Sequence, residues 1–196
     1  IEKHLPMGGG LGGGSSNAAT TLLAMNRLWE LNLGEDQLAE IGLRLGADVP
    51  VFVRGHAAFG EGVGEKLTPT NPPEDWFVVL KPECNISTGK IFSAEGLTRD
   101  TPKIKIRPAF EGDASRYRND CEDVVRKLYP EVNQSLEWLS QFGPARLTGT
   151  GACIFGRFPT ESAARIIWES KPSGITGFVA KGVNHSPLHK KLTELK

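Results

Sequence analysis

The sequence contains little cysteine, and the spacing of the few cysteines present narrows the classes of protein to consider. There are three of them, Cys84, Cys121 and Cys153, widely separated and without a CxxC pair. This pattern fits neither a disulfide framework nor a structural zinc site. We therefore expect a protein of a reducing cytoplasm.

An excess of charge of either sign is also missing. The 23 Lys and Arg residues balance the 23 Asp and Glu residues, so nucleic acid and anionic membranes are not expected partners. Apolar runs are short, as at 77–80, whereas a bilayer span needs about 20 apolar residues. With 196 residues and 39% hydrophobic content, the chain can form one substantial core or two small ones. We expect a soluble protein that binds a small molecule.

Helical periodicity dominates the first part of the chain. Apolar residues near helical spacing predict a helix over 15–31, which a glycine-rich segment precedes. A second helix is predicted over 36–45 and ends at Gly46. Its apolar face is expected to bury three residues, Leu38, Ile41 and Leu45.

Gly and Pro then mark a boundary. A short strand is predicted at 57–59, and the turn-rich stretch after it ends in Asn71-Pro72-Pro73. We predict a first domain over residues 1–75 and a second domain over residues 76–196.

The second domain has the element order of a split ferredoxin-like α+β fold, β-α-β-β-α-β. Its strands are predicted at 77–80, 145–148, 153–156 and 178–183. Two adjacent helices, at 120–128 and 132–142, fill the first helical position, and a helix at 160–169 fills the second. The region 93–115 is polar and turn-rich, and it suggests only a short strand at 103–106.

The glycine-rich run before the first helix carries the strongest functional signal. Six glycines lie between Pro6 and Ser15, and each costs about 0.5 to 1 kcal/mol relative to alanine in regular structure, so a compensating ligand is expected. A backbone without Cβ atoms can turn sharply and present several N–H donors to a polyphosphate. Ser15, Ser16 and Asn17 add short polar side chains suited to phosphate oxygens or a phosphate-bound Mg²⁺.

Other interpretations of these glycines stay open. A flexible linker before a capped helix would not need the interleaved Pro6 and Leu11. The spacing Gly8-x-Gly10-x-x-Gly13 also satisfies the fingerprint of dinucleotide-binding oxidoreductases. That fingerprint requires an apolar strand before it and an acid about 20 residues beyond it that closes the next strand, whereas Glu30 lies late in the predicted helix.

The run from Leu5 to Ala19, LPMGGGLGGGSSNAA, resembles the second conserved motif of the GHMP kinases, in the glycine-expanded form of diphosphocytidyl-methylerythritol kinases. Three further segments resemble the same family in the same order, at 46–52 (GADVPVF), 147–153 (LTGTGAC) and 181–188 (KGVNHSPL). The resemblance implies the two-domain GHMP kinase fold with its first domain truncated, in a bacterial cytoplasmic enzyme of isoprenoid precursor synthesis. It implies phosphate transfer from ATP, with Mg²⁺, to the 2-hydroxyl of diphosphocytidyl methylerythritol. Another GHMP small-molecule kinase is the alternative.

Phosphorylating an alcohol requires a group that orients the hydroxyl and can accept its proton, and Asp48 is the candidate. Local sequence alone favours an aspartate that caps a turn or a short helix, whereas the resemblance implies a catalytic residue that also binds substrate. The resemblance further implies substrate contacts by Thr88, Phe92, Thr148 and Gly149, with the Phe92 ring stacked on the cytosine. From the residues alone, Phe92 is a core aromatic, and Thr148 and Gly149 belong to a hairpin turn.

The nucleotide would be held by the glycine run and by a preceding lysine, although a lone lysine before a turn is more often only solvated. These ATP-binding candidates are Lys3, Pro6, Met7, Gly8, Gly9, Gly10, Leu11, Gly12, Gly13, Gly14, Ser15, Ser16 and Asn17. Ser15 or Ser16 is also the candidate contact for Mg²⁺ through the nucleotide.

The start of the chain departs from the family. The sequence begins at Ile1 and has no counterpart of the first family motif, of its lysine, or of the Tyr-His pair that grips cytidine. We expect a fragment of a kinase that is inactive by itself, and a module that binds nucleotide without chemistry stays an alternative. A homodimer is left open.

Overall fold

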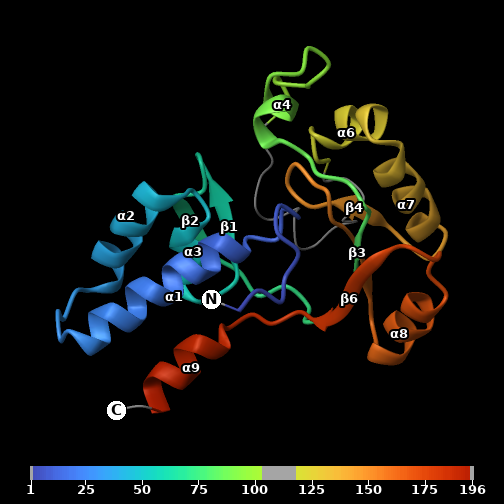
Figure 1. Ribbon diagram of the computed structural model, residues 1–196. Helices are drawn as coiled ribbons and strands as arrows, with labels where there is room; N and C mark the ends of the chain where they lie inside the picture. Colours follow the sequence, from blue (N-terminus) through green and yellow to red (C-terminus); the bar gives the residue numbers. More distant parts are fainter. Residues whose placement is uncertain (1, 103–117, 195–196) are drawn as a thin grey trace. The chain divides into compact units, whose positions relative to one another are not determined.

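The computed structural model describes residues 2–102 and 118–194 (Figure 1). Its contacts divide the chain into two compact units. Unit 1 contains Ile1–Leu11 and Asp75–Gly182, and unit 2 contains Gly12–Glu74 and Val183–Lys196. The predicted division of the sequence after residue 75 stays a prediction.

Unit 1 is built on a four-stranded sheet in the order β4-β5-β3-β6, in which every neighbouring pair is antiparallel. Its strands are β3 (Trp76–Lys81), β4 (Ala145–Leu147), β5 (Ile154–Phe158) and β6 (Thr176–Lys181). Its helices are α4 (Thr88–Phe92), α6 (Glu122–Leu128), α7 (Pro130–Ser140) and α8 (Glu161–Glu169). The predicted β-α-β-β-α-β order is confirmed, with α6 and α7 filling the first helical position.

The core of unit 1 lies between this sheet and helices α7 and α8, which Figure 1 shows on the same side of the sheet. Val78 and Leu80 of β3 are fully buried, and alternate residues of a strand share a face. Helix α7 begins with Pro130, whose missing N–H costs nothing at this position. Helix α8 begins after Thr160, whose hydroxyl accepts a hydrogen bond from the Ala163 N–H at 3.2 Å.

Unit 2 consists of helices and one hairpin. Its helices are α1 (Gly13–Leu28), α2 (Glu35–Leu45), α3 (Val49–Arg54) and α9 (Pro187–Glu194), and its hairpin strands are β1 (Ala58–Glu61) and β2 (Lys66–Pro69). Helix α1 ends before the predicted residue 31 because the Asn26 side chain folds the chain back. Its Nδ2 donates to the Leu33 carbonyl at 3.1 Å, and its Oδ1 accepts from the Leu33 N–H at 2.9 Å.

The prediction that Ile41 and Leu45 are buried is wrong, since they are 36% and 62% exposed. Helix α2 instead buries Leu38 together with the small residues Ala39 and Gly42. A Cβ added to Gly42 would lie 2.8 Å from Val49 Cγ1, so the absence of a side chain lets α3 approach closely. The core of unit 2 contains Ala19, Leu38, Ala39, Val49 and Val53.

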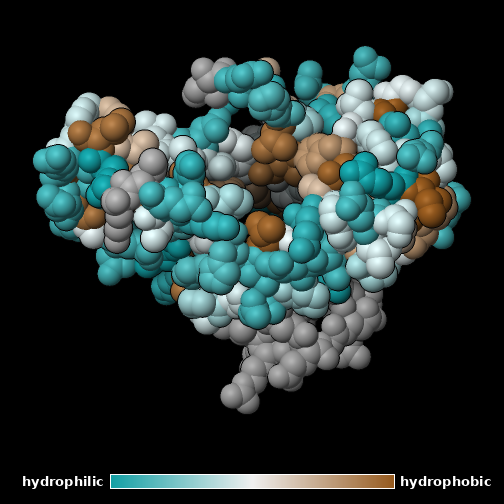
Figure 2. Space-filling view, turned by 90° about the horizontal axis from the view of Figure 1, so that it is seen from below, coloured by the Kyte–Doolittle hydropathy of each residue, from teal (hydrophilic) through white to brown (hydrophobic). Residues whose placement is uncertain are grey.

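Among the residues that the structure describes, four short elements were not predicted, namely α3, α4, α9 and β2. The suggested strand at 103–106 lies outside the described residues. Among the described residues, no helix combines the length and the hydropathy needed to cross a membrane. Figure 2 shows one face of the molecule, where hydrophilic side chains predominate and hydrophobic ones form scattered groups.

Candidate functional site

The backbone of the glycine run depends on its missing side chains. Gly10 has φ of +72°, in the left-handed region that favours glycine, and an added Cβ would collide with the Thr148 carbonyl oxygen. A Cβ added to Gly9 would lie 2.5 Å from Cys153 Sγ. Within unit 1, this part of the run therefore packs directly against the end of β4 and the start of β5.

Hydrogen bonds fix the same contact. The Thr148 hydroxyl donates to the Gly9 carbonyl at 2.6 Å, and the Cys153 N–H donates to the same oxygen at 3.2 Å. The structure thus brings together Thr148 and the glycine run, two candidates 139 residues apart in the sequence. Because two donors hold the Gly9 carbonyl, its direction is fixed.

The turn from Thr148 to Gly151 also contacts the start of α4. The hydroxyls of Thr88 and Thr150 lie 3.0 Å apart and share a hydrogen bond. Phe92, the last residue of α4, is 54% exposed, so it is not the core aromatic that its residue type suggests by default. Its ring is accessible to a planar ligand, as stacking on a base requires.

The second half of the glycine run opens α1 in unit 2. Gly12 is the N-cap residue and supplies no side-chain hydrogen bond, and the first turn contains no acidic residue. The N–H groups and the partial positive charge at this end are therefore not neutralised by an N-cap side chain or a first-turn acid. Ser15, Ser16 and Asn17 lie in this first turn.

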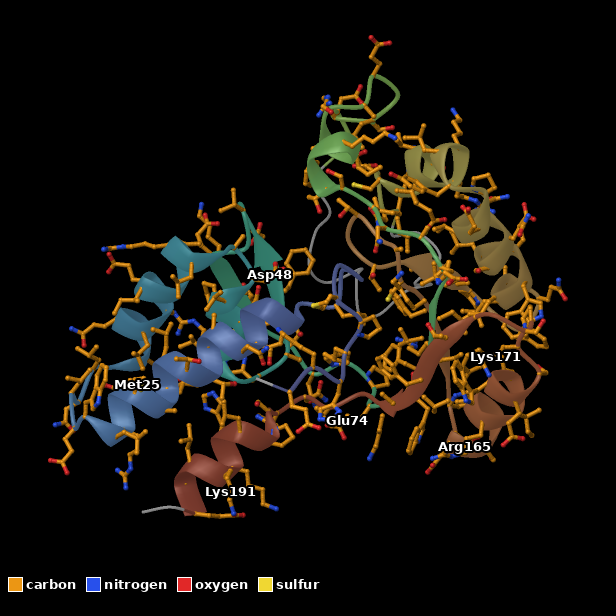
Figure 3. The ribbon with its side chains drawn as sticks, viewed as in Figure 1. Met25, Asp48, Glu74, Arg165, Lys171 and Lys191 are labelled. Atoms are coloured by element: carbon orange, nitrogen blue, oxygen red, sulfur yellow. The ribbon has the colours of Figure 1, made fainter. Side chains whose placement is uncertain are left out.

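Asp48 immediately precedes α3 in unit 2 (Figure 3). It occupies the N-cap position, but its side chain makes no capping hydrogen bond and is exposed. The turn that carries it lies beside the first turn of α1, because a Cβ added to Gly46 would be 3.9 Å from Ser15 Oγ. On the other side, the Ala47 carbonyl packs against Gly64 of the β1–β2 hairpin, 2.9 Å from the Cβ position.

The two metal candidates, Ser15 and Ser16, are adjacent in the first turn of α1. Across residues 2–102 and 118–194, no group of three or more His, Cys, Asp and Glu side chains is placed to hold an ion. Mg²⁺ at nucleotide sites usually takes phosphate and water oxygens plus one or two protein oxygens. The adjacent hydroxyls of Ser15 and Ser16 suit that role chemically. Lys3 is exposed and makes no hydrogen bond or ion pair to another candidate among the described residues.

Cys153 lies beneath Gly9 but is not set up as a nucleophile. Burial raises the pKa of its thiol to about 11, against a smaller lowering by Lys81. The thiol is therefore protonated at neutral pH and acts as a small packing group.

Sequence reasoning missed Asn119, whose side chain reaches the Thr148 turn. Its Nδ2 donates to the Leu147 carbonyl at 3.1 Å and to the Gly149 carbonyl at 2.7 Å. The sequence shows only an asparagine just before a predicted helix. Such a residue indicates a helix N-cap and gives no sign of a contact with a distant turn.

Comparison with known families now defines the class. The family model described as GHMP kinases N terminal domain matches residues 1–56, and the one described as GHMP kinases C terminal matches residues 105–170. The matches are in the expected order, and together they define a kinase of the GHMP class.

Curated relatives narrow the class further. The chain is 98% identical over 196 residues to the 4-diphosphocytidyl-2-C-methyl-D-erythritol kinase of Marinobacter nauticus, covering 100% of this chain and 68% of that protein. It is 58% identical to the enzyme of the same name from Hahella chejuensis, covering 65% of that protein. The chain thus belongs to the 4-diphosphocytidyl-2-C-methyl-D-erythritol kinase family and spans about two thirds of the length of these relatives.

Solved structures agree with this assignment. A crystal structure of 4-(cytidine 5'-diphospho)-2C-methyl-D-erythritol kinase superposes with a TM-score of 0.77 at 30% identity, over 92% of this chain and 68% of that one. A homoserine kinase from Cytophaga hutchinsonii reaches a TM-score of 0.71 at 15% identity, over 94% of this chain and 69% of that one. The second likeness shows the shared fold alone. The predicted GHMP kinase family and fold are confirmed, and the dinucleotide-binding alternative finds no support.

Proposed function

We propose that an enzyme containing this chain transfers the γ-phosphate of ATP to the 2-hydroxyl of 4-diphosphocytidyl-2-C-methyl-D-erythritol, in the non-mevalonate route to isoprenoid precursors. The name of the 98% identical relative supports the substrate. The observation that carries the chemistry is local to unit 2. There, Gly46, two residues before Asp48, lies against Ser15 in the first turn of α1, which supports a site that uses both the carboxylate and the helix N-terminus.

The proposed ATP contacts come from the backbone of the glycine run, residues Pro6 to Asn17. A phosphate is attracted by N–H groups and repelled by carbonyl oxygens. The Gly9 carbonyl is held by the Thr148 hydroxyl and the Cys153 N–H, so its negative end is directed to those donors. The unneutralised start of α1 adds N–H donors and a partial positive charge. Lys3 supplies a positive charge to the same nucleotide.

Asp48 orients the acceptor hydroxyl in this proposal. The hydroxyl oxygen forms a bond to the γ-phosphorus, the bond from that phosphorus to the bridging oxygen breaks, and ADP leaves with the bonding electrons. The hydroxyl proton passes to an Asp48 carboxylate oxygen. No hydrogen bond or ion pair among the described residues occupies this carboxylate, which supports the assignment.

The other candidates complete the substrate contacts. Phe92 offers an exposed ring to the cytosine, and Thr88, Thr148 and Gly149 belong to the bonded group at the turn. Mg²⁺ on the nucleotide would neutralise phosphate charge, with Ser15 or Ser16 as its protein contact. The bacterial relatives support a bacterial cytoplasm as the location.

An ADP-release assay tests the proposal. The enzyme is a chimera in which this 196-residue chain replaces the matching residues of the full-length Marinobacter nauticus relative. Acceptors are the diphosphocytidyl substrate, mevalonate, homoserine and galactose. Turnover confined to the first acceptor is expected. Turnover on another alcohol would overturn the substrate assignment, and protection from unfolding by NAD(H) but not by ATP with Mg²⁺ would overturn the nucleotide assignment.

Size-exclusion chromatography with light scattering of the same chimera would show whether it is the homodimer left open above.

A further inference from the structure

Asn119, just before α6, reaches three backbone groups with one side chain. Its Oδ1 accepts a hydrogen bond from the Cys121 N–H at 3.0 Å, which steadies the start of α6. Its Nδ2 donates at 3.1 Å to the Leu147 carbonyl and at 2.7 Å to the Gly149 carbonyl. These two carbonyls lie on either side of Thr148.

Glu122, one helical turn after Asn119, binds the other backbone group of Leu147, its N–H. Its Oε2 accepts a hydrogen bond from the Leu147 N–H at 3.1 Å. Both backbone groups of Leu147 are therefore bound by side chains from residues 119–122. Thr148 in turn donates its hydroxyl to the Gly9 carbonyl at 2.6 Å. One continuous series of hydrogen bonds thus runs from α6 through the turn to the glycine run, all within unit 1.

We propose that Asn119 is a positioning residue for ATP binding. It fixes the backbone on both sides of Thr148 and thereby sets the place from which the Thr148 hydroxyl holds the Gly9 carbonyl. This inference rests on the proposed function, since the glycine run is argued there to hold ATP. Asn119 acts through Thr148 and does not itself contact the nucleotide.

The two ends of the Asn119 amide separate this role from a purely structural one. Replacing Asn119 by Asp keeps an oxygen that accepts from the Cys121 N–H, so the start of α6 is retained. The same change removes both donations to the turn and sets a carboxylate oxygen against two carbonyl oxygens. Asn119→Ala loses both ends. A role confined to helix α6 predicts a defect in Asn119→Ala alone, whereas the positioning role predicts a defect in both variants.

Steady-state kinetics of the chimera test the proposal. We expect Asn119→Asp and Asn119→Ala each to raise KM for ATP about tenfold, because each leaves turn carbonyls unpaired. KM for the diphosphocytidyl substrate should rise as well, since Thr148 and Gly149 are proposed substrate contacts on the same turn. The matched control is Asn133→Ala, since Asn133 is a half-buried asparagine of the same unit that binds Arg126 and Glu137 away from the turn. It should leave both KM values unchanged.

Two further outcomes decide the route of the effect. Combining Asn119→Ala with Thr148→Val should raise KM for ATP no more than the larger single change, since both act on one series of bonds. Fully additive effects would overturn the route through Thr148. An unchanged KM for ATP in folded Asn119→Asp would overturn the proposal itself.

Amide hydrogen exchange of the ligand-free chimera separates this inference from the proposed function. The N–H groups of Thr148, Gly151 and Cys153 are all hydrogen-bonded in and around the turn. In Asn119→Asp the exchange rates of these amides should be about tenfold higher than in the parent, whereas Asn133→Ala should leave them unchanged. If the parent shows no kinase turnover, the proposed function fails, yet this exchange result still supports or overturns the positioning of the turn.

Discussion

The Thr148 turn of unit 1 and the Asp48 turn of unit 2 are built in opposite ways. The first is bound by the glycine run, by Thr88, by Asn119 and by Glu122. The second presents an exposed carboxylate with no hydrogen bond or ion pair among the described residues. Groups that stabilise fixed phosphate charge work best when preorganised, whereas a proton acceptor must keep its lone pairs available. The difference matches the roles proposed for the two turns.

Asp48→Asn gives the sharpest test of this comparison. The amide keeps the size of the side chain but cannot accept the hydroxyl proton. We expect kcat of the chimera to fall by about 10² to 10⁴, with KM for ATP little changed. Stopped-assay ADP release at saturating substrates measures it.

The matched control for that change is Asp36→Asn, an exposed aspartate of the same unit that pairs with Arg54. It should leave kcat unchanged. A near-normal kcat in Asp48→Asn would remove Asp48 from the mechanism and leave the exposed carboxylate of unit 2 without a role.

Gly10→Ala tests the contact between the glycine run and the Thr148 turn. The alanine would have to adopt φ of +72° and would collide with the Thr148 carbonyl, so the glycine run must move. We expect KM for ATP to rise at least about tenfold, measured in the same assay. Gly174→Ala is the matched control in unit 1, because it shares a positive φ of +85° but meets no atom within 4 Å. Equal effects of the two changes on KM for ATP would mean that backbone strain, and not the contact with Thr148, is responsible.

Some of this arrangement could be predicted from the sequence and some could not. The functional importance of the glycine run was predictable, because six glycines are unfavourable in regular structure unless a ligand compensates. The order of strands and helices in unit 1 was predictable, because apolar periodicity is a local property of the sequence. The contact of Asn119 was not predictable, because its acceptors are backbone carbonyls 28 and 30 residues further along the chain. Backbone carbonyls have the same chemistry in every residue and leave no compositional signal.

The burial error on α2 has a related cause. Periodicity shows that Leu38, Ile41 and Leu45 lie near one face of the helix, but not which part of that face a neighbour covers. The neighbour, α3, selects the side where Gly42 has no side chain and Val49 can approach. A glycine has no side chain and does not contribute to a pattern of apolar residues. Close helix packing at a glycine therefore cannot be predicted from that pattern.

Cys153 supplies a pH test of the packing beneath Gly9. Burial raises the pKa of its thiol to about 11 from the ordinary 9.0. The stabilisation that comes with the protonated, buried thiol is thus complete below pH 9 and is lost as pH rises toward 11. Between these pH values the parent should lose roughly 1 to 2 kcal/mol more unfolding free energy than Cys153→Ala. Urea unfolding at pH 8, 9, 10 and 11 measures it, and parallel curves for the two proteins would contradict the burial of this thiol.

The smallest effect is expected at Arg54, the residue that ends α3 after the Asp48 turn. Its guanidinium lies 2.9 Å from Asp36 and 3.0 Å from Glu35 of α2, and the hydrogen bond with Asp36 raises its pKa. Because these pairs are partly exposed, Arg54→Met should cost no more than about 1 kcal/mol in unfolding free energy, read from the urea midpoint. Arg44→Met is the control, since it removes a more exposed pair with Glu40 and should cost less. If Arg54→Met also lowers kcat, the ion pairs of Arg54 hold the Asp48 turn in place. The Asp48 turn would then depend on fixed neighbouring contacts, as the Thr148 turn does.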